Sequence, residues 1–347
     1  MPNLPKSKLL VALFAVVALL ALPAAAQATL AYTVNVFKPS VFVAQDNGKG
    51  AKRVGPGLNP HVSPNGKLVV FESPSAKQPP EMKLYDVETG TTTTLFTPWR
   101  ESSTVAWSPD STMVAALRGG ELGKRTLYVV NVETGKATRI ATGFFDGVTF
   151  SPDNTEVAFG LAASMDFPSK VDVIRDPVTG GPTSPLTHDG ISAYPLWGPQ
   201  GQIVFVKQLN AKSRKYGPKN DLFLMNGDGK GVKRLTRTKV DPLAQGLFPT
   251  AWSANGNQLL AEFGGQDQSY AVTVNPKTGA ERNLSPGNPE TGFVGTALSA
   301  DGKTVLGGLG GFEGPGANGK LKIVSVPYGG GKQKVLVKGG FNPSWGG

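Results

Sequence analysis

The stretch AWSPDS at 106–111 decides the fold, because close copies of it recur along the whole chain. Each copy is a short apolar run followed by a polar turn. The other copies read HVSPNG at 61–66, TFSPDN at 149–154, LWGPQG at 196–201, AWSANG at 251–256, ALSADG at 297–302 and, shortened, PSWGG at 343–347. A spacing of roughly 45 residues is typical of solenoids, propellers and other repeat arrays.

One unit of the repeat predicts four short strands. The expected strands lie at 104–107, 113–117, 127–132 and 136–140. Between the first two strands, Pro109 fixes φ and Asp110 can bond the nearby backbone, as in a tight turn. Gly135 suits the positive φ of a hairpin between the last two. Because some strands, such as 68–71, are apolar on both faces, both faces must be covered. Blades stacked around an axis cover them in this way.

The two ends of the chain predict how such a ring closes. The last copy, at 341–345, matches a first strand with nothing after it, while 30–36, 40–44 and 52–54 read as later strands without a first one. A solenoid needs polar caps, and none is visible. We therefore expect an all-β chain with one β-propeller domain at 29–347. Seven blades of four antiparallel strands are favoured, the C-terminal strand closing the N-terminal blade. Six blades are the alternative, if the N-terminal strands pad an existing blade.

Residues 1–28 are typical of a secretory signal. Lys6 and Lys8 precede an apolar run at 9–22, and Ala26-Gln27-Ala28 is a small-x-small cleavage site. The alternative is an uncleaved membrane anchor, but the run is shorter than the roughly 20 residues that span a bilayer. No later segment is apolar enough to span a membrane. We expect cleavage near Ala28 and a secreted or periplasmic protein.

Charge and composition limit the partners and the chemistry. The formal net charge of +10 becomes +8 without the signal, which favours a protein or an anionic envelope component as partner. Nucleic acid is not expected, because there is no basic stripe interleaved with aromatic residues. Cysteine is absent, and the two histidines, His61 and His188, cannot form a three-histidine metal site. We expect no metal, no cofactor and a monomer.

The repeated phrase, together with the turns and strands that follow it, resembles the WD40-like repeat of TolB-type β-propellers. Trp107-Ser108-Pro109-Asp110, Phe150-Ser151-Pro152-Asp153 and Arg234-Leu235-Thr236 carry the resemblance. It covers nearly all of the chain after the signal. It implies an exported propeller that serves as a platform for protein interactions. Similar propellers also accompany serine peptidases, and others resemble oligosaccharide lyases with metal-binding histidines, which two scattered histidines cannot supply.

Propeller geometry separates two faces of the ring. The turns after the first and third strands of each unit are short and uniform, and they define the short-turn face. The connections after the second and fourth strands vary, and they define the variable-loop face, where binding residues are expected. The candidate binding residues on this face are Trp99, Arg100, Phe144, Phe145, His188, Lys207, Arg214, Lys215, Tyr216, Arg237 and Asp241.

Several residues that suggest chemistry are better explained by structure. Acids in the repeated turns, such as Asp110, Asp153 and Asp301, are interpreted as turn formers. Tryptophans at the ends of first strands are interpreted as packing between blades. His188-Asp189 lacks a nucleophile, and no G-x-S-x-G elbow is present. The favoured hypothesis is a non-enzymatic interaction scaffold.

Two alternatives to the scaffold stay open. One is an extracellular hydrolase or lyase acting on glycans or peptides, with carboxylates lining the central channel. The other is a binder of glycans or small molecules that uses Trp99, Phe144 and Tyr216.

Overall fold

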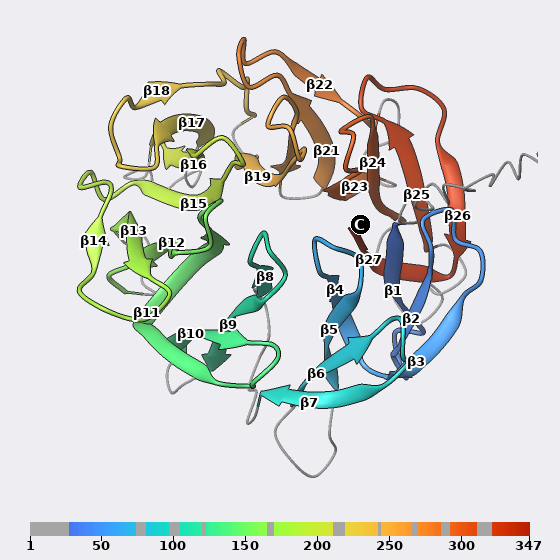
Figure 1. Cartoon of the computed structure of the whole chain (residues 1–347). Coiled ribbons are helices and arrows are strands. Elements are labelled where there is room, and N and C mark those ends of the chain that lie inside the picture. Colours follow the sequence, from blue (N-terminus) through green and yellow to red (C-terminus); the bar gives the residue numbers. More distant parts are fainter. Residues whose placement is uncertain are drawn as a thin grey trace, which may run out of the picture.

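The computed structural model describes residues 28–73, 81–96, 105–119, 123–164, 170–210, 219–241, 244–265, 269–285, 292–310 and 321–347. Every named element in these ranges is a β-strand, which confirms the predicted all-β class. The predicted signal at 1–28 lies outside them except for Ala28. Figure 1 shows the sheets arranged around a central axis, with β4, β8, β15, β19, β23 and β27 on the inner side.

Segments from both ends of the chain share one sheet. Its order is β27-β1-β2-β3, and the last strand pairs antiparallel with the first, Leu30 opposite Trp345 and Thr33 opposite Phe341. The strands of this sheet are β1 (Thr29–Val34), β2 (Ser40–Gln45), β3 (Lys52–Pro56) and β27 (Gly340–Gly346). The segments predicted as strands at the two ends of the chain therefore pair with each other.

Two further sheets each contain four strands in chain order. The first is made of β4 (Leu58–Val62), β5 (Leu68–Ser73), β6 (Glu81–Asp86) and β7 (Thr92–Phe96). The second is made of β23 (Phe293–Leu298), β24 (Thr304–Leu309), β25 (Lys322–Pro327) and β26 (Lys334–Lys338). Both follow the predicted pattern of a tight turn after the first and third strands.

The remaining units are joined in pairs. The long strand β11 pairs with β10 through its first half and with β12 through its second half. That sheet contains β8 (Val105–Trp107), β9 (Met113–Gly119), β10 (Arg125–Asn131), β11 (Ala137–Phe150), β12 (Glu156–Ala162), β13 (Val171–Pro177) and β14 (Ser184–Pro185). The other joined sheet contains β15 (Ser192–Trp197), β16 (Gln202–Gln208), β17 (Asn220–Asn226), β18 (Lys233–Arg234), β19 (Gly246–Trp252), β20 (Leu259–Gly264), β21 (Ser269–Val274) and β22 (Glu281–Asn283).

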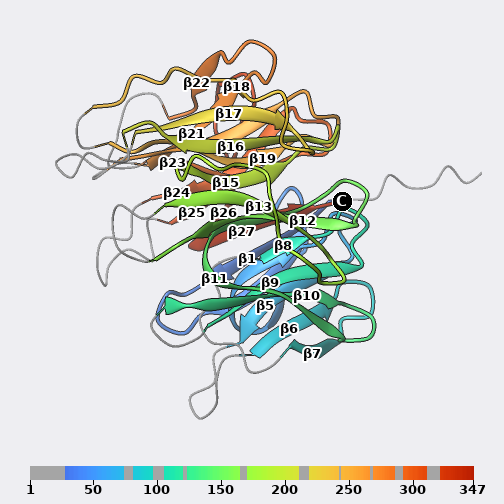
Figure 2. The ribbon, with the colours of Figure 1, turned by 90° about the vertical axis from the view of Figure 1, so that its left-hand side faces the viewer.

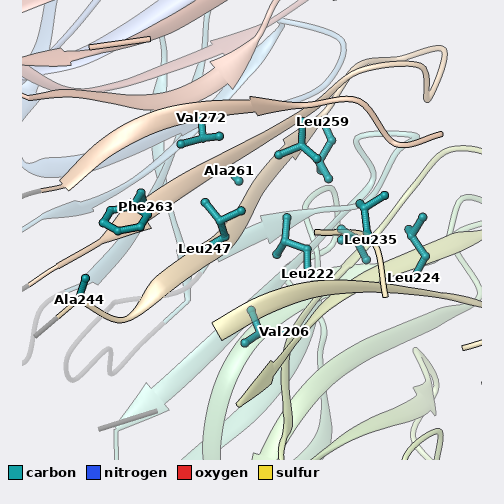
Figure 3. Packing of buried hydrophobic residues seen from close by; sticks show 12 residues of the cluster. Val206, Leu222, Leu224, Leu235, Ala244, Leu247, Leu259, Ala261, Phe263 and Val272 are labelled. Carbon is teal, nitrogen blue, oxygen red and sulfur yellow. The ribbon is translucent and has the colours of Figure 1, made fainter. Parts of the chain in front are cut away.

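Apolar side chains between neighbouring units form the core. Figure 3 shows one such layer, in which Val206 and Leu222 of one unit face Leu247, Leu259 and others of the next. These side chains are fully or almost fully buried, as strands that are apolar on both faces require. Figure 2 shows the sheets stacked on one another from the side. The stacking explains why the hydrophobic pattern of these strands is continuous and does not alternate.

The repeated turns form one hydrogen-bonded motif. In five units a serine hydroxyl donates to the Asp or Asn two residues later, as Ser108 Oγ does to Asp110 Oδ1 at 2.6 Å and Ser253 Oγ to Asn255 Oδ1 at 2.8 Å. Hydrogen bonds from Ser151 and Thr155 lower the pKa of Asp153. Asn and Asp play the same part, which agrees with their interpretation as turn formers.

The tryptophans of the first strands connect neighbouring units. Trp107 Nε1 donates to the carbonyl oxygen of His61 at 3.0 Å, and Trp252 Nε1 donates to that of Leu196 at 3.2 Å. In both pairs the acceptor belongs to the first strand of the preceding unit. The indole rings therefore join adjacent units at the inner side of the ring.

Candidate functional site

The candidate binding residues fall into two groups. Trp99, Arg100, Arg214, Lys215 and Tyr216 lie outside the residues that the structure describes. The structure places Phe144, Phe145, His188, Lys207, Arg237 and Asp241. These six residues lie in four different elements of the fold, two strands and two connections.

The placement of Phe144 and Phe145 in a loop is wrong. Both lie inside β11, where they pair with Ala162 and Leu161 of β12. Phe145 is 9 % exposed, and its ring packs edge-on against Phe159 with centroids 5.3 Å apart. The chain runs from one unit into the next as one continuous strand here, so no loop exists for these rings to occupy. Phe145 is part of the core.

Lys207 already has a partner. Its Nζ lies 2.7 Å from Asp189 Oδ2, and the same amine lies over the rings of Phe205 and Phe223 at 5.9 and 5.2 Å. Asp189 also accepts a hydrogen bond from Ser192 Oγ at 2.8 Å. This ion pair links the end of β16 to the connection before β15. The neighbouring His188 is exposed.

A buried carboxylate organises the connection between β18 and β19. Asp221 is 3 % exposed and accepts hydrogen bonds from Arg234, from Thr236 Oγ1 at 3.2 Å and from the backbone N–H of Thr238 at 3.0 Å. Buried charges are found where they are paired and hydrogen-bonded. Asp221 therefore fixes the start of this connection against the first residues of β17.

Two further contacts fix the rest of that connection. Lys219 Nζ donates to the carbonyl oxygens of Asp241 and Ala244, the latter at 3.0 Å. Thr238 Oγ1 donates to Glu281 Oε1 of the next unit at 3.0 Å. Lys219 is therefore committed to the backbone. Arg237 and Lys239 are exposed between these anchor points.

We name residues 235–241 and 244–246 the anchored loop. It begins at the buried Leu235, ends at Gly246 and carries Arg237, Lys239 and Asp241 as exposed charges. Among its described residues, two exposed side chains are cationic and one is anionic. A loop held at several points loses little conformational freedom on binding. Its two exposed cations suit the recognition of an anionic surface.

The structure also brings together Asp146, Tyr194 and Phe248 on inner strands, a cluster outside the predicted set. Tyr194 donates a side-chain hydrogen bond to Asp146. Its ring packs edge-on against Phe248, with centroids 5.1 Å apart. Tyr194 has a φ of 49°, a conformation that is rare for a bulky residue and that marks candidate functional positions.

The cluster sits at irregularities of the inner strands. The register shifts between Asp146 and Val148 and again between Ala193 and Leu196. Asn59 and Asn342 also have positive φ at the corresponding place in their units. The sequence carried a signal that was missed: the pairs Asn59-Pro60, Tyr194-Pro195 and Asn342-Pro343 recur shortly before the repeated turn.

Burial sets the electrostatics of this cluster. It raises the pKa of Asp146, although the hydrogen bond from Tyr194 and the charge of Arg125 act in the opposite direction. Burial and the nearby Asp146 carboxylate raise the pKa of Tyr194 to about 12. The phenol therefore stays protonated, and the carboxyl group retains its proton to higher pH than an exposed aspartate.

The described residues contain no group of three or more His, Asp or Glu side chains placed to hold a metal ion. They also contain no helix with the length and apolar character needed to cross a bilayer.

Comparison with known proteins finds likeness in structure only. No protein-family model and no curated protein matches the sequence. Among solved structures, TolB from Acinetobacter baumannii aligns over 92 % of this chain and 66 % of its own, with a TM-score of 0.53 and 16 % identity. The β-propeller domain of the Trilobed protease from Pyrococcus furiosus aligns over 90 % and 95 %, with a TM-score of 0.64 and 13 % identity.

A lyase shares the same architecture. Oligogalacturonate lyase in complex with manganese aligns over 89 % of this chain and 83 % of its own, with a TM-score of 0.60 and 15 % identity. At such identities these likenesses show the fold, which is a β-propeller of the kind found in TolB. The chain spans slightly less than two thirds of the length of the Acinetobacter TolB.

Proposed function

We propose that this protein is an exported, non-enzymatic β-propeller that binds a protein or an anionic envelope component through its variable-loop face. The observation that carries the proposal is the anchored loop. Asp221 and Lys219 hold its backbone, while Arg237 and Lys239 remain exposed. A fixed loop with exposed cations suits an acidic partner, and the likeness to TolB propellers agrees with an interaction role.

Two further features belong to this proposal. The formal charge of +8 expected after cleavage near Ala28 favours anionic partners in the periplasm or outside the cell. We also propose seven blades, with β27 supplying the inner strand of the blade formed by β1, β2 and β3. The pairing of β27 with β1 supports this closure.

A pair of charge reversals tests the binding face. The variant Arg237→Glu/Lys239→Glu changes two exposed cations of the anchored loop. The variant Lys136→Glu/Lys332→Glu makes the same change of charge in exposed turns on the short-turn face. Each purified protein is used as bait for an envelope extract. We expect the first variant to lose the proteins that the wild type recovers and the second to keep them.

Two outcomes contradict the proposal. One is an equal effect of both variants, which would reflect net charge alone. The other is that the wild-type protein recovers no specific partner from the extract and turns over a glycan or peptide substrate.

A hydrolase or lyase is the second candidate function, and Asp146 is the observation that favours it. A carboxyl group that keeps its proton to higher pH suits general-acid catalysis, and an oligogalacturonate lyase shares the fold. Release of products from a panel of oligosaccharides and peptides tests this. Activity that is lost in Asp146→Asn supports it, whereas no turnover by the wild type removes it.

A further inference from the structure

A cavity of about 290 Å³ opens on the short-turn face, opposite the predicted binding face. Residues from several units line it, among them Trp252, Leu298, Trp345, Pro64, Asp46 and Ala28. Its volume is near the lower end of the range of about 300–1,000 Å³ that small-molecule sites occupy. The cavity therefore has room for a compact ligand.

The position of the cavity follows from the topology. On this face the repeated turns bond to one another, as the backbone N–H of Asn65 does to Ser111 Oγ at 3.1 Å and that of Asp110 to Asn154 Oδ1 at 3.1 Å. At the chain end, the backbone N–H of Gly347 donates to the carbonyl oxygen of Pro64 in the neighbouring turn at 2.9 Å. The inner strand β27 and its neighbour β1 lie far apart in sequence, so no tight turn joins them. Gly346 borders the cavity where such a turn would lie, next to Ala28 at the expected cleavage site.

The two indoles offer the cavity their hydrocarbon surface and not their N–H groups. Trp252 Nε1 is committed to the carbonyl oxygen of Leu196 at 3.2 Å. Trp345 Nε1 is buried, and no acceptor for it is found among the described residues. The carbon atoms of the two indoles, together with the side chains of Leu298 and Pro64, therefore make the lining of the cavity largely apolar.

Asp46 adds a negative charge to this apolar wall. It is partly buried at the turn between β2 and β3, and the described residues give it no ion pair or side-chain hydrogen bond. Aromatic faces attract cations through the ring quadrupole, and indole is the strongest such ring. An unpaired carboxylate in the same lining as two indoles favours positive charge in the same way.

We propose that this cavity binds a small organic cation with an apolar surface, of the alkylammonium or quaternary ammonium class. Trp252 and Trp345 contact the alkyl groups that surround the charge, and Asp46 supplies the counter-charge. The cavity lies on the opposite face from the variable loops, so this proposal can be correct or wrong independently of the interaction role proposed above.

Two probes of the same shape test the proposal. Choline and 3,3-dimethyl-1-butanol differ only in the charged nitrogen, which is a neutral carbon in the alcohol. Binding is followed by calorimetry and by the shifts of the tryptophan indole N–H signals. We expect choline to bind on the order of tenfold more tightly than the alcohol, and more weakly as salt is added.

Variants locate the site. Asp46→Asn is expected to weaken choline binding several-fold and to leave the alcohol unaffected. Glu133→Gln removes the same charge from an exposed turn on the same face and is expected to change neither. Leu298→Phe fills the cavity and is expected to abolish binding of both probes, with circular dichroism confirming that the variant is folded.

Three results overturn the proposal. Equal affinity for the two probes means an apolar cavity without preference for charge. Equal weakening by Asp46→Asn and Glu133→Gln means attraction by overall charge. No saturable binding of choline by the wild-type protein means that the cavity does not take this class of ligand.

Discussion

The hydroxyl oxygen of Ser344 accepts a hydrogen bond from the backbone N–H of Val62, 2.9 Å away and 282 residues earlier in the chain. A second bond runs beside it, from Asn342 Nδ2 to Asn59 Oδ1 at 2.7 Å. Both connect β27 to β4, the first strand of the following unit. The last strand is therefore held on two sides, by β1 within its sheet and by β4 next to it.

Replacing Ser344 with alanine tests the first of these bonds. The variant leaves the N–H of Val62 without its acceptor at a largely buried position, which costs about 1–3 kcal/mol. We expect a lower free energy of unfolding in denaturant titration. Ser325→Ala in β25 is the matched control, because the described residues show no hydrogen bond from that hydroxyl. Equal stability of the two variants would mean that the Ser344 contact contributes nothing.

Deletion of 341–347 tests how much the closing strand contributes. It uncovers one edge of β1 and removes Trp345 from its packing with Leu30, Tyr32 and Leu306. Loss of one large aromatic contact alone costs about 3–5 kcal/mol. We expect the melting temperature to fall sharply in a thermal scan. An unchanged melting temperature would show that β27 does not close the ring.

The repeated turns could be predicted from sequence because their chemistry is local. Ser151, Pro152 and Asp153 are neighbours in the chain, and Ser151 donates a hydrogen bond to Asp153 in the structure. The strand β11 could not be predicted, because the repeat implies a loop between units and the continuous pairing of Phe144 and Phe145 depends on β12.

The predicted basic residues illustrate the same limit. Lys207 was visible as a cation, but its pairing with Asp189 joins two elements whose proximity only the fold creates. The cavity beside Trp345 combines side chains from several units, so no local motif encodes it. Tyr194 could be predicted in part. Its pairing with the following proline recurs in other units and is visible in the sequence, whereas its hydrogen bond to Asp146 depends on the fold.

Asp153 tests whether the repeated acids serve only as turn formers. Its Oδ1 accepts from Ser151 Oγ at 2.5 Å and from Thr155 Oγ1 at 2.8 Å. Asparagine keeps this acceptor, as Asn65 and Asn255 do in other units. We expect Asp153→Asn to melt close to the wild type and Asp153→Ala to lose about 1 kcal/mol. If both lose the same stability, the carboxylate charge itself is required.

Asp146 is expected to make stability depend on pH. Burial raises its pKa, so ionisation is harder in the folded chain than in the unfolded one. Its contribution to stability is full below the unfolded pKa, near 3.8, and is lost as pH rises through the folded pKa. Asp146→Asn, which can still accept from Tyr194, is expected to melt higher than the wild type at pH 7. This gain should vanish near pH 4, and a gain that is the same at both pH values would contradict the assignment.

His61 is expected to act in the opposite direction. Burial lowers its pKa from 6.5 to about 4, so the folded chain holds this imidazole neutral where the unfolded chain takes up a proton. Stability from this group is full above pH 6.5 and is lost as pH falls toward 4, by about 2 kcal/mol at pH 5. Leu196 occupies the corresponding place in its unit, so His61→Leu keeps an apolar side chain there. We expect denaturant titrations to show similar stability for the two proteins at pH 7 and greater stability for His61→Leu at pH 5. Parallel loss of stability in both proteins would mean that His61 already takes up its proton in the folded state.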